Sequence, residues 1–181
     1  MRIYLTPITE ECTSMIVKWR NSPKVSKHCF NRVPITEESH RAFVKANVET
    51  GNYKQYIVNR IDEESGVAAY PIATVYLKDM DLINHRCELC IFTSDDEEWN
   101  TESQMLAIKM VLEKAFKEFA MHKVYSYVFS RFKDEVALLT RSGFHREAIF
   151  EKEALSMDGD YWDAYRMAIF ADEYDERFGI V

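Results

Sequence analysis

The side chain best suited to proton transfer is a glutamate inside an otherwise apolar stretch. Glu88 lies within residues 87–92, whose sequence CELCIF is typical of a β-strand. Because side chains alternate along a strand, Glu88 is expected to share one face with Cys90 and Phe92. A carboxylate on such a face can accept a proton from a substrate, directly or through water, so Glu88 is the candidate catalytic base. The alternative is a structural ion pair, for which the candidate partners are Arg20, Arg86 and His85.

The pair Cys87-x-x-Cys90, with His85 nearby, has the residue types of a zinc or redox site. An offset of three residues along a strand directs the two thiols to opposite faces, so joint ligation of one ion is not expected. Redox-active pairs of this spacing begin a helix instead. We therefore predict no metal site and four free thiols.

Composition and charge exclude several function classes. The five glycines lie too far apart for either of the common phosphate-binding motifs, G-x-G-x-x-G and G-x-x-x-x-G-K. A formal net charge of −7, with no block of lysine or arginine, argues against sequence-independent nucleic-acid binding. The N-terminus lacks the apolar region of a secretory signal, and no apolar run reaches the ~20 residues of a membrane helix. We predict a cytoplasmic protein that binds neither nucleic acid nor membrane.

The elements that position these residues are predicted from apolar periodicity and turn residues. The chain of 181 residues is expected to be one domain, residues 1–181. Helices are predicted at residues 10–20, 36–48, 101–120 and 133–141. Strands are predicted at residues 2–8, 53–58, 71–77, 87–92, 123–130, 145–155 and 161–170, the last two as a hairpin. This order indicates a mixed α/β (α+β) fold of about seven strands and about four helices, with a ferredoxin-like domain as the alternative.

Short phrases spread along nearly the whole chain occur in a characteristic order. They are WRN (19–21), PIATV (71–75), NH (84–85), HKV (122–124), SGF (142–144) and DGDYWD (158–163). The series resembles the GNAT superfamily of acyl-CoA N-acyltransferases, in the branch of ribosomal-protein, spermidine and amino-sugar acetyltransferases. The resemblance implies a central sheet with two splayed central strands. It also implies acetyl transfer from acetyl-CoA to a primary amine of a small molecule, an amino-sugar or a protein N-terminus, with homodimer formation left open.

In this family the diphosphate of acetyl-CoA lies on free backbone amides at the start of the long helix, within a glycine-rich loop. Alignment on Ala115-Phe116 places that loop at residues 99–104. The resemblance thus implies a set of cofactor-binding residues around this loop and the strand splay. They are Phe92, Thr93, Trp99, Asn100, Thr101, Glu102, Ser103, Gln104, Met105 and Phe132.

The chain departs from the family pattern at these positions. Glu102 and Gln104 replace glycines, and Glu102 places a carboxylate where a diphosphate would lie. Thr101 and Gln104 also fit a capping box that would occupy the first helix amides. Leu139 stands where the family often has a proton-donating tyrosine, so Ser130 is a second catalytic candidate, with Thr140 or water as alternatives.

The end of the first helix corresponds to the acceptor wall in this family. Its residues Trp19, Arg20 and Asn21 are therefore candidate substrate-binding residues, with core packing or a surface ion pair as the alternative. Two other functions remain open at this point. One is a non-catalytic GNAT-fold binding module that has lost the phosphate loop, and the other is an acyltransferase that takes its acyl group from a carrier protein.

Overall fold

A seven-stranded mixed sheet forms the centre of the molecule, in the order β1-β2-β3-β4-β5-β7-β6. The computed structural model describes residues 2–61, 69–92, 94 and 96–179. The strands are β1 (Arg2–Pro7), β2 (Lys54–Ile61), β3 (Ala69–Asp81), β4 (Arg86–Phe92), β5 (Lys123–Phe129), β6 (His145–Leu155) and β7 (Tyr161–Phe170). All seven match predicted strands, including the hairpin of β6 and β7, and the mixed α/β fold class is confirmed.

The helices flank this sheet and include one that the sequence patterns did not indicate. They are α1 (Thr13–Asn21), α2 (Pro23–Ser26), α3 (Glu37–Phe43), α4 (Thr101–Glu113), α5 (Lys133–Arg141) and α6 (Ala171–Phe178). Five-residue π-helical turns, Val44–Val48 and Lys114–Glu118, extend α3 and α4. The addition is α6, whereas α2 lies within residues 21–34, for which the sequence favours either a loop or a short helical piece. In α6 only Tyr174 is buried, so the apolar period that reveals a helix is almost absent.

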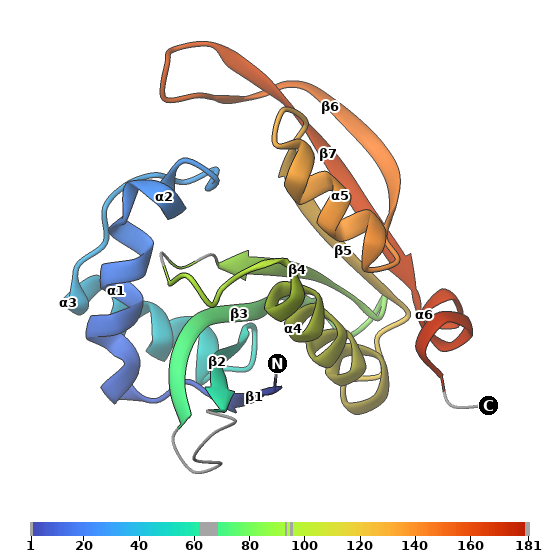
Figure 1. The fold of residues 1–181 in the computed structure, drawn as a ribbon, viewed down its shortest axis with the longest axis horizontal. Helices are drawn as coiled ribbons and strands as arrows, with labels where there is room; N and C mark the ends of the chain where they lie inside the picture. The colour runs from blue at the N-terminus through green and yellow to red at the C-terminus, as the bar shows by residue number, and fades with distance from the viewer. Residues whose placement is uncertain (1, 62–68, 93, 95, 180–181) are drawn as a thin grey trace.

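The sheet opens between β4 and β5. These two strands run parallel and pair at only three positions, which end at Glu88 and Tyr125. All other neighbouring strands pair antiparallel. Figure 1 shows the half that contains β1 to β4 diverging from the half that contains β5 to β7, with α4 beside the point of divergence. The splayed central strands are thus as expected.

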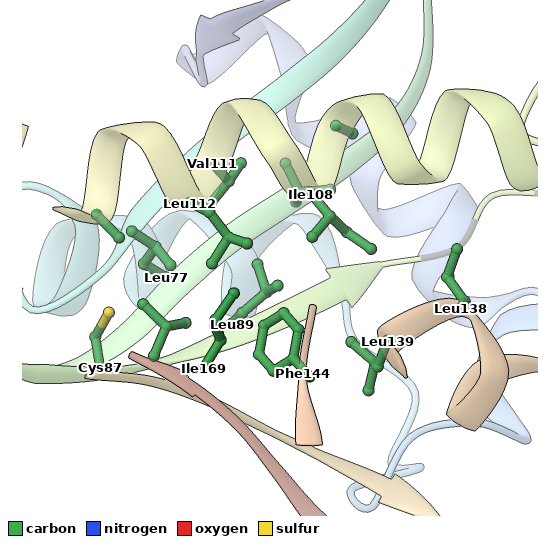
Figure 2. Close-up of a cluster of buried hydrophobic side chains, with 14 of the residues drawn as sticks. Leu77, Cys87, Leu89, Ile108, Val111, Leu112, Leu138, Leu139, Phe144 and Ile169 are labelled. Atoms are coloured by element: carbon green, nitrogen blue, oxygen red, sulfur yellow. The ribbon is translucent and has the colours of Figure 1, made fainter. Parts of the chain in front are cut away.

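The main core lies between α4 and the sheet. Ile108, Val111 and Leu112 recur at the three- and four-residue spacing that gives a helix one apolar face, and each is at most 1% exposed. Figure 2 shows this face directed toward the strand residues Leu77 and Leu89, with Phe144 and Ile169 of the other half beside them. Both halves of the splayed sheet are therefore tied to one helix. No helix within the described ranges is long and apolar enough to cross a membrane.

Candidate active site

A cleft of about 700 Å³ opens where β4 and β5 part. Its lining comes from the α1–α2 region, both splayed strands, the first turn of α4 and one face of α5. The lining residues include Arg20, His28, Lys78, Glu88, Leu89, Cys90, Asn100, Thr101, Gln104, Ser126, Val128, Glu135, Leu138, Leu139 and Arg141. The predicted base and part of the predicted cofactor loop are thus brought to one cavity from distant parts of the chain.

Glu88 is buried in this cleft with only 6% of its surface exposed. In the β3–β4 ladder it lies opposite Lys78, and the Lys78 Nζ atom is 3.1 Å from Glu88 Oε1. Burial raises the pKa of Glu88 above its usual range, and the ammonium of Lys78 offsets part of that rise. A buried carboxylate with a raised pKa and one charged partner is a candidate for proton transfer in catalysis.

The ion-pair partner of Glu88 in the structure is Lys78 rather than any of the three residues suggested from the sequence. Arg86 Nε instead pairs with Asp81 Oδ2 at 3.1 Å, in the turn that joins β3 to β4. Arg20 donates a hydrogen bond to the carbonyl oxygen of Asn31. Lys78 was not predicted as the partner of Glu88 because ten residues separate the two in the sequence. Only the register of the antiparallel β3–β4 ladder places them opposite each other.

Cys90 lies beside Glu88 on the same face, as strand alternation predicts. Its Sγ donates to Glu88 Oε1 at 3.3 Å, while Cys87 is fully buried in the core on the other face. Burial raises the pKa of the Cys90 thiol well above its usual value, and the nearby Glu88 charge adds to this effect. The neutral thiol therefore serves as a hydrogen-bond donor to the base rather than as a nucleophile. Within the described ranges, no group of three or more His, Cys, Asp and Glu residues could hold a metal ion.

The first turn of α4 faces the cleft with its amides already hydrogen bonded. Asn100 Oδ1 accepts from the backbone amides of Glu102 at 3.0 Å and of Ser103 at 3.4 Å. The capping box expected from Thr101 and Gln104 is therefore wrong. The helix begins at Thr101, and Asn100 has the extended backbone of an N-cap residue, with φ −101° and ψ −178°. Gln104 Nε2 instead donates to the carbonyl of Trp99 at 3.2 Å.

Of the nine expected cofactor residues that the structure describes, Asn100, Thr101 and Gln104 line the cleft. Trp99 and Ser103 are buried beneath the turn, and Met105 packs against the main core. Phe92, Glu102 and Phe132 lie elsewhere; the Phe132 ring contacts His28, with ring centroids 4.3 Å apart. Thr93 lies outside the described residues.

Of the three residues expected at the acceptor wall, Arg20 reaches the cleft. Trp19 is 7% exposed and packs with Ile16 and Ile57 in a separate small cluster. Asn21 binds the backbone of Ile35 in both directions: it donates to the carbonyl at 2.8 Å and accepts from the amide at 2.9 Å. Asn21 therefore shapes the loop that follows α2 rather than facing a substrate.

Ser130 is not brought into the cleft. It lines a separate open hollow of about 580 Å³ with residues of the β6–β7 hairpin. The Thr140 hydroxyl donates to the carbonyl of Val136 at 2.8 Å, within α5. Leu139 does line the cleft, at the position where the family often has its tyrosine. Ser126 on β5, which no sequence signal singled out, is among the hydroxyl-bearing residues that line the cleft.

The loop after α2 closes one side of the cleft by contacting the opposite half of the molecule. His28 Nδ1 lies 2.5 Å from Glu135 Oε1 on α5. The Phe30 ring stacks on Phe129 of β5, with centroids 4.4 Å apart. These contacts join the two splayed halves across the cavity.

Comparisons with known proteins place this geometry in a family. The family model described as acetyltransferase (GNAT) domain matches residues 2–145. The fold is similar to that of spermidine N-acetyltransferase from Vibrio cholerae in complex with CoA and spermine, with a TM-score of 0.86 and 19% identity over 95% of this chain and 97% of that chain. A chimera of that enzyme gives a TM-score of 0.82 at 18% identity over 96% and 98% of the two chains. No curated protein matches the chain. Because the family model spans most of the sequence, the chain belongs to the GNAT acetyltransferase family.

Proposed function

We propose that the protein transfers the acetyl group of acetyl-CoA to the primary amine of a small cationic molecule. The observation that carries this proposal is the buried carboxylate of Glu88 in the cleft between β4 and β5, with the start of α4 on the same cavity. The formal net charge of −7 favours a cationic acceptor. The similar fold solved with CoA and spermine supports the same choice.

The residues at the start of α4 fit a diphosphate once one side chain moves. Rotation of Asn100 frees the amides of Glu102 and Ser103 in the first turn of α4, at the loss of a cap worth about 1 kcal/mol. Free amides at a helix N-terminus bind phosphate groups, and Arg141 on the same cavity adds a positive charge. The carboxylate of Glu102 in the first turn opposes this attraction. We therefore expect micromolar or weaker rather than tight binding of CoA.

Glu88 accepts the proton that the acceptor must lose. An ammonium group is not nucleophilic, and a carboxylate with a raised pKa removes its proton more readily than an exposed one does. The ammonium of Lys78 opposes the rise in the pKa of Glu88 and so favours the ionised carboxylate that this role needs. The thioester of acetyl-CoA supplies the activated acetyl group.

The test is a thiol-release assay with acetyl-CoA against a panel of polyamines, amino-sugars and peptide amines. Glu88→Gln is expected to lower kcat by roughly 10²–10⁴-fold while leaving the affinity for CoA, measured by calorimetry, unchanged. Glu113→Gln, on the exposed side of α4, is the matched control. Absence of CoA binding at millimolar concentration, or equal rates for wild type and Glu88→Gln, would contradict the proposal.

A further inference from the structure

The cleft has two sides because it passes between diverging strands of one sheet. Glu88 pairs with Lys78 of β3 and with Tyr125 of β5, and paired residues project from the same face of a sheet. Tyr127, two residues beyond Tyr125, projects from that face as well. Leu89 lies on the opposite face, directed toward α4 (Figure 2). We call the face that carries Glu88, Lys78 and Tyr127 the Glu88 side of the cleft.

Aromatic rings line the Glu88 side. Phe30 and Tyr127 both face the cavity, and their ring centroids are 6.3 Å apart in an edge-on arrangement. Tyr76 also lines this side, since it pairs with Cys90, two residues from Glu88. Phe30 remains 41% exposed although its ring also stacks on a second ring of β5. A further ring that enters the cavity can therefore add to an existing aromatic cluster.

The charged side chains of the Glu88 side are mainly cationic. Helix α1 packs on this side through Ile57, which pairs with Thr74, two residues before Tyr76. The helices α1 and α2 and the strand β3 bring three cations to the cavity, namely Arg20, Lys24 and Lys78. Like charges repel one another at short range, so these cations disfavour an acceptor that carries several positive charges.

The carboxylates are distributed differently. Among the described residues that line the cleft, Asp134 and Glu135 are the carboxylates other than Glu88. Both belong to α5, whose Leu138 and Leu139 pack in the main core on the side of α4. Glu135 is also engaged by the ring of the α2 loop histidine. Within the described residues, the Glu88 side thus offers one carboxylate for one ammonium group.

We propose that the acceptor is a monoamine in which a short chain joins the single ammonium group to an aromatic ring. This inference rests on the proposed function and narrows its substrate class. The ammonium group points to Glu88, and the ring lies against Phe30 and Tyr127. Ring-to-ring contacts add to the burial of apolar surface, so an aromatic acceptor gains more here than an alkyl acceptor of the same size. A polyamine would place its additional ammonium groups beside Lys24 and Lys78 instead.

The test compares kcat/KM for three acceptors, with acetyl-CoA as the acyl donor. Phenethylamine and cyclohexylethylamine have the same chain and similar bulk, and they differ in the aromaticity of the ring. Phenethylamine is expected to exceed cyclohexylethylamine by roughly 3–10-fold. It is expected to exceed spermidine by about tenfold or more, because spermidine brings additional positive charges to the Glu88 side.

Variants assign these preferences to the residues of the cleft. Phe30→Leu keeps apolar bulk but removes the ring, and is expected to lower kcat/KM for phenethylamine by roughly 3–10-fold with a smaller effect on cyclohexylethylamine. Phe30→Tyr, which keeps the ring, is expected to retain the preference. Tyr4→Ala, at a 37% exposed ring on β1, is the control.

Reversal of one charge tests the electrostatic part. Lys24→Glu is expected to raise kcat/KM for spermidine relative to phenethylamine, because the variant adds a carboxylate where a cation lined the cavity. Lys27→Glu, an exposed position in the same segment, makes the same change of net charge and is expected to leave the ratio unchanged. Thermal melting of each variant checks that the fold is retained.

The outcomes separate this inference from the proposed function. A wild type that acetylates spermidine in preference to phenethylamine overturns the inference and leaves the transferase intact. Equal kcat/KM values for phenethylamine and cyclohexylethylamine also overturn it, as does a Phe30→Leu variant that lowers both values equally. A wild type that acetylates none of the amines and does not bind CoA refutes the proposed function itself.

Discussion

Removal of the positive charge of Lys78 tests how the pKa of Glu88 is set. The Nζ–Oε1 distance is 3.1 Å, and the Glu88 side chain is only 8% exposed. At an effective dielectric constant of about 20, two unit charges at this separation attract by about 5 kcal/mol. Dehydration of both groups cancels part of this energy, and an opposite charge so close typically lowers a carboxyl pKa by about 1–3 units. Lys78→Met is therefore expected to raise the pKa of Glu88 by about that amount.

The assay is the pH dependence of kcat/KM for acetyl transfer. Glu88 must be ionised to accept a proton, so activity falls as the pH drops through its pKa. In Lys78→Met the acidic limb of the profile is expected to move upward by roughly 1–3 pH units. Activity at neutral pH then falls and recovers as the pH is raised. Lys78→Arg, which keeps the charge, is expected to leave the limb in place.

Two results would refute this reasoning. The first is an acidic limb that stays at the wild-type position in folded Lys78→Met. The second is a limb that persists in Glu88→Gln, which would show that another group titrates. Lys114→Met, which breaks a partly exposed pair with Glu118 on the continuation of α4, serves as a control for loss of charge alone.

The remaining predictions concern stability. Asn100→Ala is expected to lower the free energy of unfolding in urea by about 1 kcal/mol, because two amides lose their cap. Leu112→Ala, at a core position with 0% exposure, is expected to cost about 2–5 kcal/mol in the same measurement. Hydrogen bonds from Asn84 lower the pKa of Asp81 to about 2 in the folded protein. The ionised carboxylate therefore stabilises the fold at pH values above the pKa that Asp81 has in the unfolded chain. This contribution disappears as the pH falls toward 2. Asp81→Asn is thus expected to lower the melting temperature at pH 7, with the difference from wild type closing below about pH 4; a constant difference at all pH values would contradict the assignment.

The local patterns of the chain predicted much of this architecture. Alternation in β4 placed Glu88 and Cys90 on one face and Cys87 on the other, because side-chain direction in a strand depends only on the backbone. The apolar period of α4 predicted the helix face that covers the sheet. The short helix α6 was not predicted because it buries too few side chains to leave such a period.

The site itself depends on contacts between segments distant in the sequence. The cap on α4 was assigned one residue late because Asn100 and Thr101 are both acceptable N-cap residues, and the backbone angles decide between them. Trp19 and Asn21 looked like substrate contacts, but their side chains point to a core cluster and to the loop at Ile35. The direction of each side chain depends on how its helix packs against the rest of the molecule. A local sequence pattern does not show that packing.

The sequence by itself determined the element order, the strand face that carries Glu88 and the family phrases that agree with the GNAT fold. Only the tertiary structure decided that Lys78 is the partner of Glu88 and that Ser126, rather than Ser130, opens onto the cleft. The physical reason is that strand register and the divergence of β4 from β5 are set by long-range packing on α4. Burial and charge at the site, and hence its chemistry, arise only once that packing is complete.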